Sequence, residues 1–129
     1  MKGYINNIEK ETKDNSDYRR VIYTGKYSQL VVMSIEPGDE IGDEVHGLDQ
    51  FIRIEEGKGK LVLNETEEHE VEDDWAFIIP AGVWHNVINT GDEPLKLYSI
   101  YAPPEHRDGV VQPTKADEEE EHYDGKTTE

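Results

Sequence analysis

Residues 37–59 read PGDEIGDEVHGLDQFIRIEEGKG, and residues 75–89 read WAFIIPAGVWHNVIN. Together these two segments carry four side chains that can bind a metal ion: Glu44, His46, Gln50 and His85. Glu44 and His46 are separated by one residue, so a β-strand would point both side chains to the same face. Two imidazoles, one carboxylate and one amide oxygen are ligands that suit a divalent transition metal ion. The sequence therefore predicts a metal site formed by these two segments.

Short apolar runs bounded by turn residues continue on both sides of this stretch. The runs predict strands over residues 21–23, 29–35, 43–46, 50–55, 60–63, 68–71, 75–79, 84–88 and 95–102. This gives about nine or ten short strands with turn signals every eight to twelve residues, and no segment shows a convincing helical period. Such a pattern is typical of an all-β sandwich or barrel.

The length of 129 residues indicates a single domain. Residues 1–19 are polar and are interpreted as an N-terminal arm, and residues 20–113 as the β-barrel. Residues 114–129 hold seven acidic and two basic side chains, and we expect this acidic tail to be flexible.

Composition excludes several classes of partner. The formal net charge of −17 argues against binding to nucleic acid or to an anionic membrane surface. The chain has no cysteine, so it has neither disulfides nor thiolate chemistry. No apolar stretch is long enough to span a membrane, and we expect a cytoplasmic protein.

The spacing of the two segments resembles the two sequence motifs of the cupin superfamily. The first motif is Gly, five residues, His-x-His, three or four residues, Glu, six residues, Gly, and this chain has Gly38, Glu44-Val45-His46, Gln50 and Gly57 at those intervals. The second ends Pro-x-Gly, two residues, His, three residues, Asn, and this chain has Pro80-Ala81-Gly82, His85 and Asn89. The resemblance implies an all-β cupin fold, the double-stranded β-helix or jelly-roll barrel, in a single domain.

Three residues depart from the family pattern. Glu44 replaces the first histidine, Gln50 replaces the glutamate, and Asp74 replaces the glycine that usually opens the second motif. The first two changes leave one carboxylate in the ligand set, so its charge is unchanged. The resemblance thus implies one divalent transition metal ion, with Zn, Mn, Fe and Ni left open, held by Glu44, His46, Gln50 and His85.

The resemblance implies a metal-dependent cupin enzyme that acts on a small polar metabolite. The chemistry would be sugar or keto-acid isomerisation, or a related proton transfer, with the metal as a Lewis acid. Glu44 is the candidate base, and Tyr101 on the last long strand is the candidate donor to substrate. An Fe-dependent dioxygenase is one alternative, and a non-catalytic small-ligand-binding or sensor module is another.

The remaining expectations concern oligomeric state and other polar residues. Cupins are commonly dimers, and residues 1–19 could cover exposed strand edges, so a homodimer is expected. Arg53 is the one basic residue evident near the motifs, and its strand parity faces outward, which disfavours a phosphorylated substrate. His69, His106 and His122 are interpreted as surface residues.

Overall fold

The two longest strands bring candidate site residues together at the centre of the larger sheet. In the computed structural model, which describes residues 3–129, β3 (Asp49–Glu56) pairs antiparallel with β8 (Leu95–Ala102). Gln50 lies directly opposite Tyr101 in this pairing. Both side chains are buried, and side chains on each strand alternate between the core and the outer face. This alternation places Gln50 and Tyr101 on the same inward face.

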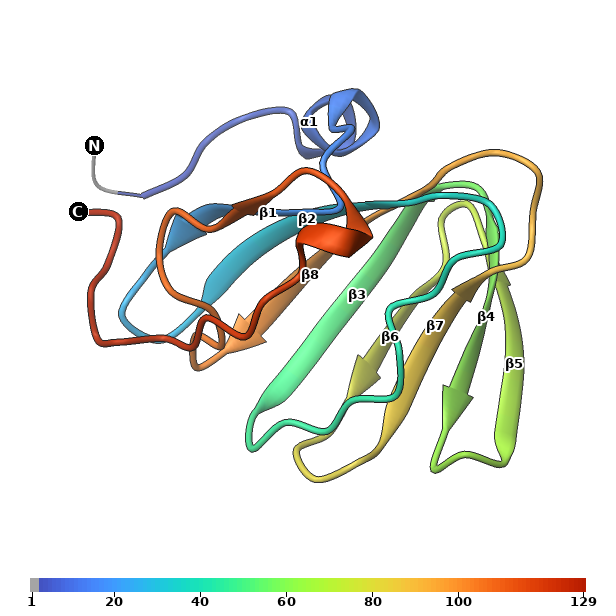
Figure 1. The fold of residues 1–129 in the computed structure, drawn as a ribbon. Coiled ribbons are helices and arrows are strands. Elements are labelled where there is room, and N and C mark those ends of the chain that lie inside the picture. The colour runs from blue at the N-terminus through green and yellow to red at the C-terminus, as the bar shows by residue number, and fades with distance from the viewer. Residues whose placement is uncertain (1–2) are drawn as a thin grey trace.

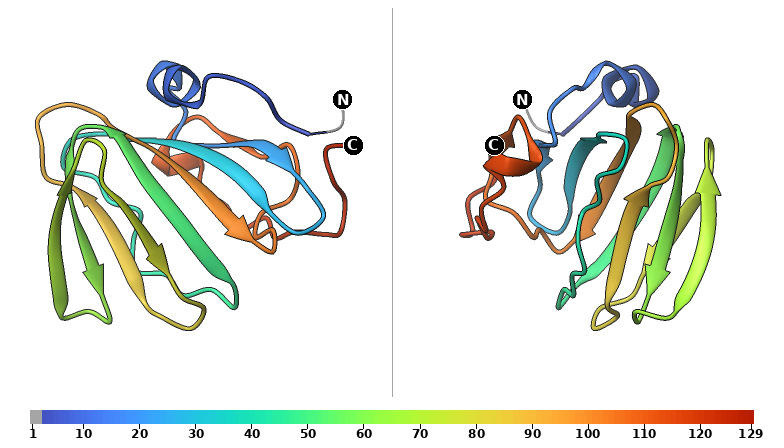
Figure 2. Two further views of the ribbon diagram at one scale, coloured as in Figure 1. Left: turned by 180° about the vertical axis from the view of Figure 1, so that it is seen from behind. Right: turned by 45° about the vertical axis from the view of Figure 1, so that its right-hand side comes forward.

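The described chain forms two antiparallel sheets, which are the two layers seen in Figures 1 and 2. The larger has the strand order β6-β3-β8-β2-β1-β9, and the smaller has the order β5-β4-β7. The other strands are β1 (Arg19–Thr24), β2 (Gln29–Ile35), β4 (Lys58–Leu63), β5 (Glu67–Glu72), β6 (Ala76–Ile79), β7 (His85–Asn89) and β9 (Val111–Gln112). The prediction of a mostly β fold in one small domain is confirmed, and the bounds of β2 and β8 are those expected from sequence.

The hydrophobic core lies between the two sheets. Ile52, Ile54 and Leu97 from the larger sheet are fully buried, as is Val87 from the smaller sheet. Burial of such aliphatic side chains contributes roughly 1.5–3 kcal/mol each. The β-branched and leucine-rich inner face thus explains why the alternating strands of the sequence collapse into two layers.

Residues 43–46 do not form the regular strand that the sequence predicts. Instead, Glu40 and Glu44 each form an isolated β-bridge to β7, with Ile88 and His85 respectively. The segment follows the edge of β7 irregularly, because Gly38 and Gly42 both have a positive φ that interrupts an extended run. The inward and outward alternation survives all the same: Val45 is exposed, and its neighbours Glu44 and His46 are partly buried.

Two short helices were not expected from the sequence. Helix α1 (Ile8–Asp14) begins at Asn7, whose side chain accepts a hydrogen bond from the Lys10 backbone N–H at 3.1 Å. The helix packs against β2, β3 and β8. The 3₁₀ helix η1 spans Lys115–Asp117. Neither of these helices, the ones found in residues 3–129, is long and apolar enough to cross a membrane.

The C-terminal segment returns along the larger sheet after β9 pairs with β1 (Figure 1). The Arg107 backbone N–H donates to the Glu121 carbonyl at 2.8 Å, and the Tyr123 N–H donates to the Glu105 carbonyl at 2.9 Å. The Thr128 N–H donates to the Thr24 carbonyl at 2.9 Å. Residues 114–129, expected to be a flexible tail, therefore make specific backbone contacts and close one side of the fold.

Gly59 gives a direct test of packing between β4 and its neighbours. A Cβ atom at Gly59 would lie 2.8 Å from the Ile88 carbonyl oxygen and 3.0 Å from Leu95 Cδ2. Because the nearest atom belongs to the backbone, Gly59→Ala should lower the free energy of unfolding by about 1–3 kcal/mol in urea denaturation. Gly47→Ala is the matched control, because nothing lies within 4 Å of a Cβ there. Equal losses in the two variants would contradict this packing.

Candidate metal centre

The segment that carries Glu44 and His46 is fixed to the start of β7 by backbone hydrogen bonds. The Glu44 N–H donates to the His85 carbonyl and the His85 N–H to the Glu44 carbonyl, each at 2.8 Å. The Gly82 N–H donates to the His46 carbonyl at 2.9 Å. Since Glu44 and His46 share one face, these contacts bring both side chains to the side of the sheet where His85 lies.

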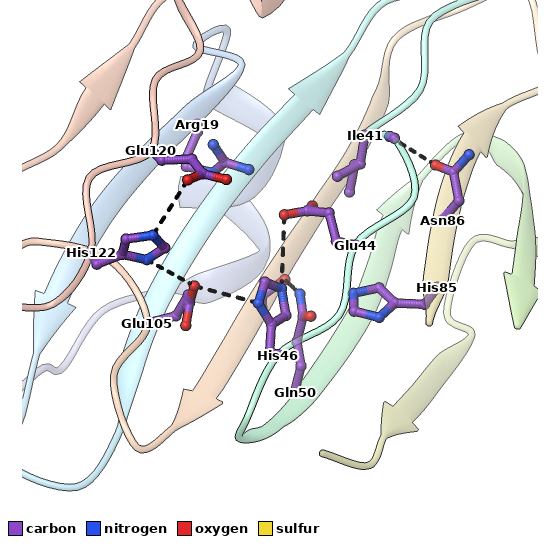
Figure 3. Close-up of polar contacts among 12 residues, drawn as sticks. Arg19, Ile41, Glu44, His46, Gln50, His85, Asn86, Glu105, Glu120 and His122 are labelled. Atoms are coloured by element: carbon purple, nitrogen blue, oxygen red, sulfur yellow. Dashed lines mark hydrogen bonds and ion pairs between the residues drawn. The ribbon is translucent and has the colours of Figure 1, made fainter. Parts of the chain in front are cut away.

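His46, Gln50 and His85 lie close together in the interior (Figure 3). The ring centroids of His46 and His85 are 5.3 Å apart. The His85 Nδ1 atom lies 3.0 Å from the Val83 carbonyl oxygen, so we assign the proton to Nδ1. The Nε2 atom of His85 then keeps a free lone pair, which is the form of imidazole that binds metals.

Gln50 supplies a buried oxygen that no protein group satisfies. Its side chain is 3% exposed, and its Nε2 donates to the Ser99 hydroxyl at 3.2 Å. Its Oε1 is buried and has no hydrogen-bond partner. Buried carbonyl oxygens are nearly always paired, because leaving one unpaired costs about 1–3 kcal/mol. An oxygen left free between two imidazoles is the arrangement that a cation would complete.

Glu44 is less closely engaged than the other three predicted ligands. One carboxylate oxygen lies 3.9 Å from His46 Nε2, and Figure 3 shows the carboxylate extending towards Arg19. Burial raises the pKa of Glu44, against the opposing charges of Arg19 and His46. Among residues 3–129, no three His, Cys, Asp or Glu side chains gather tightly enough to hold a metal ion. The close set is therefore His46, Gln50 and His85, with Glu44 beside it.

The chemistry of this donor set fits a divalent transition metal. Imidazole nitrogens suit Zn, Fe and Ni, and carboxylate and amide oxygens are compatible with the same ions and with Mn. The orphaned Gln50 oxygen and the free lone pair of His85 are both available without any backbone change. The residues present therefore fit the group that the sequence pattern implies.

A second carboxylate contacts the outer nitrogen of His46. Glu105 Oε1 lies 3.4 Å from His46 Nδ1 and also 3.4 Å from His122 Nδ1 (Figure 3). Burial alone would lower the pKa of His46, but the contact with Glu105 and the charge of Glu44 raise it. Burial opposes the ionised form of Glu105, and the contact with His46 outweighs it, so the pKa of Glu105 is lowered. Glu105 thus directs Nδ1 outward and leaves Nε2 towards the centre.

Sequence reasoning missed Glu105, and it favoured a surface position for His106 over one at the mouth of the barrel. Glu105 and His106 both follow the last long strand. The feature that could have identified them is a pair of ionisable residues directly after Pro103-Pro104 at the end of that strand. The interpretation of His106 as a surface residue is wrong: it is 9% exposed, because its backbone is held by the Gln29 side chain. His122 is largely exposed, as is His69.

Tyr101 lies in the interior, in contact with His46 and His106. Its ring packs edge-on against His46, with centroids 5.8 Å apart, and against His106 at 5.0 Å. The side chain is 2% exposed, and burial raises the pKa of its phenol well above the usual value. The hydroxyl is therefore protonated at neutral pH and can act as a donor.

Two of the candidate ligands, Glu44 and His46, line a cavity of about 610 Å³. The segment 41–46 forms one wall, Glu105 and His106 a second, and residues 118–122 a third. Arg19 and Lys115 also line this cavity, so the expectation that basic residues are absent from the site is wrong. Arg19 and Lys115 lie far from the two motifs in the sequence, so motif spacing did not identify them. Arg53, in contrast, pairs with Glu55 and Asp74 on the outer face as its parity predicts.

Comparison with known proteins agrees with the architecture. Residues 31–101 match the family model described as Cupin domain. The chain is similar to the protein YrkC of Bacillus subtilis, with 49% identity over 122 residues that cover 90% of this chain and 66% of YrkC. A protein of Acanthamoeba polyphaga mimivirus is 41% identical over 112 residues, which cover 84% of this chain and 70% of that protein. This chain thus spans about two thirds of these relatives' length.

A solved structure resembles the whole described fold. The crystal structure of BH2720 from Bacillus halodurans superposes with a TM-score of 0.87 at 52% sequence identity. The match covers 88% of this chain and 91% of that one.

Burial of His106 predicts a specific pH dependence of stability. Desolvation and the nearby Arg19 charge lower the pKa of His106 to about 3, although Glu105 opposes the shift. The pKa of histidine in the unfolded chain is about 6.5. As the pH decreases below this value, the unfolded chain binds a proton that the native state does not bind, so the free energy of unfolding decreases. The stability of the native protein relative to His106→Phe should therefore fall by about 1 kcal/mol between pH 7 and 5.5.

The measurement is urea unfolding of both proteins across this pH range. Tyr27→Phe serves as the control, because it changes an exposed side chain without removing a histidine and should keep a constant difference from the native protein. A constant difference for His106→Phe as well would contradict a buried, neutral His106.

Proposed function

This chain belongs to the cupin family, and from that premise we propose that it is a metal-dependent enzyme acting on a small polar metabolite. Cupins often bind a metal ion. We assign one divalent transition metal ion to Glu44, His46, Gln50 and His85. The proposed reaction is an isomerisation or related proton transfer next to a carbonyl group, in a sugar or keto acid.

One observation carries the metal assignment: the buried Oε1 of Gln50, which has no partner. The side-chain amide nitrogen is occupied by Ser99, so the amide orientation leaves the oxygen facing inward. His46 and His85 present their rings beside it, 5.3 Å apart. A cation in this place would satisfy the oxygen and both imidazoles at once.

A divalent ion held there would supply Lewis acidity that polarises a substrate carbonyl. Side chains of the protein would then accept and return the proton. Burial raises the pKa of Glu44, which is the direction that makes a carboxylate a better proton acceptor. Tyr101 stays protonated and can donate a hydrogen bond towards the oxygen of the substrate. Glu105 holds the His46 ring in place through Nδ1.

Metal content tests the proposed site. Protein purified without a histidine tag and reconstituted with Zn²⁺, Mn²⁺, Fe²⁺ or Ni²⁺ should contain close to one ion per chain by elemental analysis. His85→Ala and Glu44→Ala should lose most of it. His69→Ala, an exposed histidine, should keep it. No metal above background in the reconstituted native protein would overturn the proposal.

Gln50 offers a directional test of the same site. Gln50→Glu replaces a neutral oxygen by an anionic one and should raise metal affinity at least several-fold, and Gln50→Leu should lower it about tenfold or more. Both affinities are measured by competition with a chromogenic chelator, after circular dichroism shows that the variants fold. Equal affinity of the two variants would mean that Gln50 is not a ligand.

Proton exchange tests the proposed chemistry. Metal-loaded protein in D₂O should accelerate the loss of the carbon-bound proton signals of dihydroxyacetone or pyruvate in ¹H NMR. Glu44→Gln should slow this exchange by about 10²-fold or more, the usual contribution of a general base. Oxygen consumption by the Fe²⁺ form would favour the dioxygenase alternative instead. Metal binding without exchange or oxygen uptake would favour a non-catalytic ligand-binding module.

A further inference from the structure

We infer that Tyr18, Arg19 and Lys115 form a carboxylate-binding subsite in the cavity, and that a carboxylate of the substrate replaces Glu118 there. We call these three residues the carboxylate cluster. All of them except Tyr18 line the same cavity as Glu44 and His46. The identification of the ligand as a substrate rests on the proposed function. Binding of the ligand to the carboxylate cluster does not require the metal.

Three donors of the carboxylate cluster converge on a single carboxylate. The Tyr18 hydroxyl donates to Glu118 Oε2 at 3.0 Å. Arg19 Nη1 lies 3.2 Å from the same oxygen, and Lys115 Nζ donates to Glu118 Oε1 at 3.0 Å. Both oxygens of Glu118 are thereby engaged. Glu118 shows in this structure how the cluster receives a carboxylate group.

The two cations of the cluster have one carboxylate in direct contact. Two cations share the one carboxylate of Glu118, and Arg19 has a further neutral acceptor, Gln112 Oε1, at 2.9 Å. The Arg19 side chain is 4% exposed, and its Nε is buried without a partner. Burying an arginine is costly unless its donors are paired, so a buried guanidinium with an open donor favours a further anionic partner.

Both cations lie close to the aromatic ring of Tyr18. Arg19 Cζ lies 5.3 Å from the ring centroid, and Lys115 Nζ also lies 5.3 Å from it. Lys115 Nζ is fixed in addition by the Ile41 carbonyl at 2.6 Å. The cluster therefore keeps its shape through contacts that do not involve Glu118, as a preformed subsite requires.

Glu118 can leave the cluster by a side-chain rotation alone. Its side chain is 30% exposed, so a path to solvent is open. The neighbouring backbone is held independently, because Gln112 Nε2 donates to the Glu119 carbonyl at 3.0 Å and the Glu118 N–H donates to the Lys115 carbonyl at 3.1 Å. Replacement of the Glu118 carboxylate thus needs no rearrangement of the C-terminal segment.

Three other carboxylates near the cavity are engaged outside the cluster. Glu105 and Glu120 contact His122, and Glu121 pairs with Arg107. When Glu118 leaves, the cluster keeps its two cations, and Glu44 is the carboxylate whose charge still acts on Arg19 and Lys115. Because the cluster shares the cavity with Glu44 and His46, a fitting substrate would carry a carbonyl group at one end and a carboxylate at the other. The proposed class of substrates, sugars or keto acids, is thereby narrowed to oxo acids.

The test uses metal-free protein, prepared with EDTA, and succinate as the probe in isothermal titration calorimetry. The native protein should bind succinate weakly, because Glu118 competes. Glu118→Gln should bind it about tenfold more tightly, the effect of one lost competing ionic contact. Lys115→Met should bind it at least tenfold more weakly. Glu36→Gln is the control, since it removes the same charge from an exposed side chain that does not line the cavity and should leave the affinity within about twofold.

Further titrations separate the explanations. Succinamide, which is neutral, should not bind. Equal affinity of Glu118→Gln and Glu36→Gln for succinate, or tighter binding of the diamine putrescine than of succinate, would overturn the inference and identify Glu118 as a structural ion-pair partner. All these titrations omit metal, so their result is independent of the metal-content test. Succinate binding can be observed even if the protein holds no metal, and it can be absent even if the metal centre exists.

Discussion

The double hydrogen bond between Glu44 and His85 is the constraint on which the site depends. It attaches an irregular segment to the first residue of β7, and both bonds are 2.8 Å long. A shift by one residue along this edge would turn Glu44 and His46 outward and leave Gln50 and His85 without neighbours. The edge is reinforced on either side, where Ile41 pairs with Val87 and His46 with Gly82. Two segments distant in sequence are thereby held in one register.

Much of this arrangement could be predicted because it depends on local spacing. Strand alternation determines that Glu44 and His46 share a face and that Gln50 points inward, and turn residues fix where β2 and β8 begin and end. Asp74 shows the limit of pattern matching. It stands where the family usually has glycine, yet it adopts the same kind of conformation, with φ of 71°. Aspartate tolerates the left-handed region better than most residues, so the turn is retained.

The parts that could not be predicted come from contacts between the two ends of the chain. The hydrogen bond from Tyr18 to Glu118 joins residues 100 positions apart, and that from Arg19 to Gln112 joins residues 93 apart. Neither periodicity nor motif spacing carries information about such pairs. For the same reason, the acidic composition of residues 114–129 suggested only a solvated tail. Composition describes the average charge of a segment, and the position of Lys115 and Glu118 in the cavity depends on the fold around them.

Glu105 connects the two halves of the cavity physically. One of its oxygens contacts His46, a candidate metal ligand, and the same oxygen contacts His122 in the C-terminal segment, each at 3.4 Å. The backbone bond from Tyr123 to the Glu105 carbonyl and the ion pair of Arg107 with Glu121 hold that segment at the same place. These contacts do not involve Glu118. Hence the wall of the cavity would stay in position if the Glu118 side chain swung out, and the candidate metal ligands and the carboxylate cluster would keep a fixed separation. A cavity with two such attachment points would select its ligand by length as well as by charge, which a single metal centre could not do.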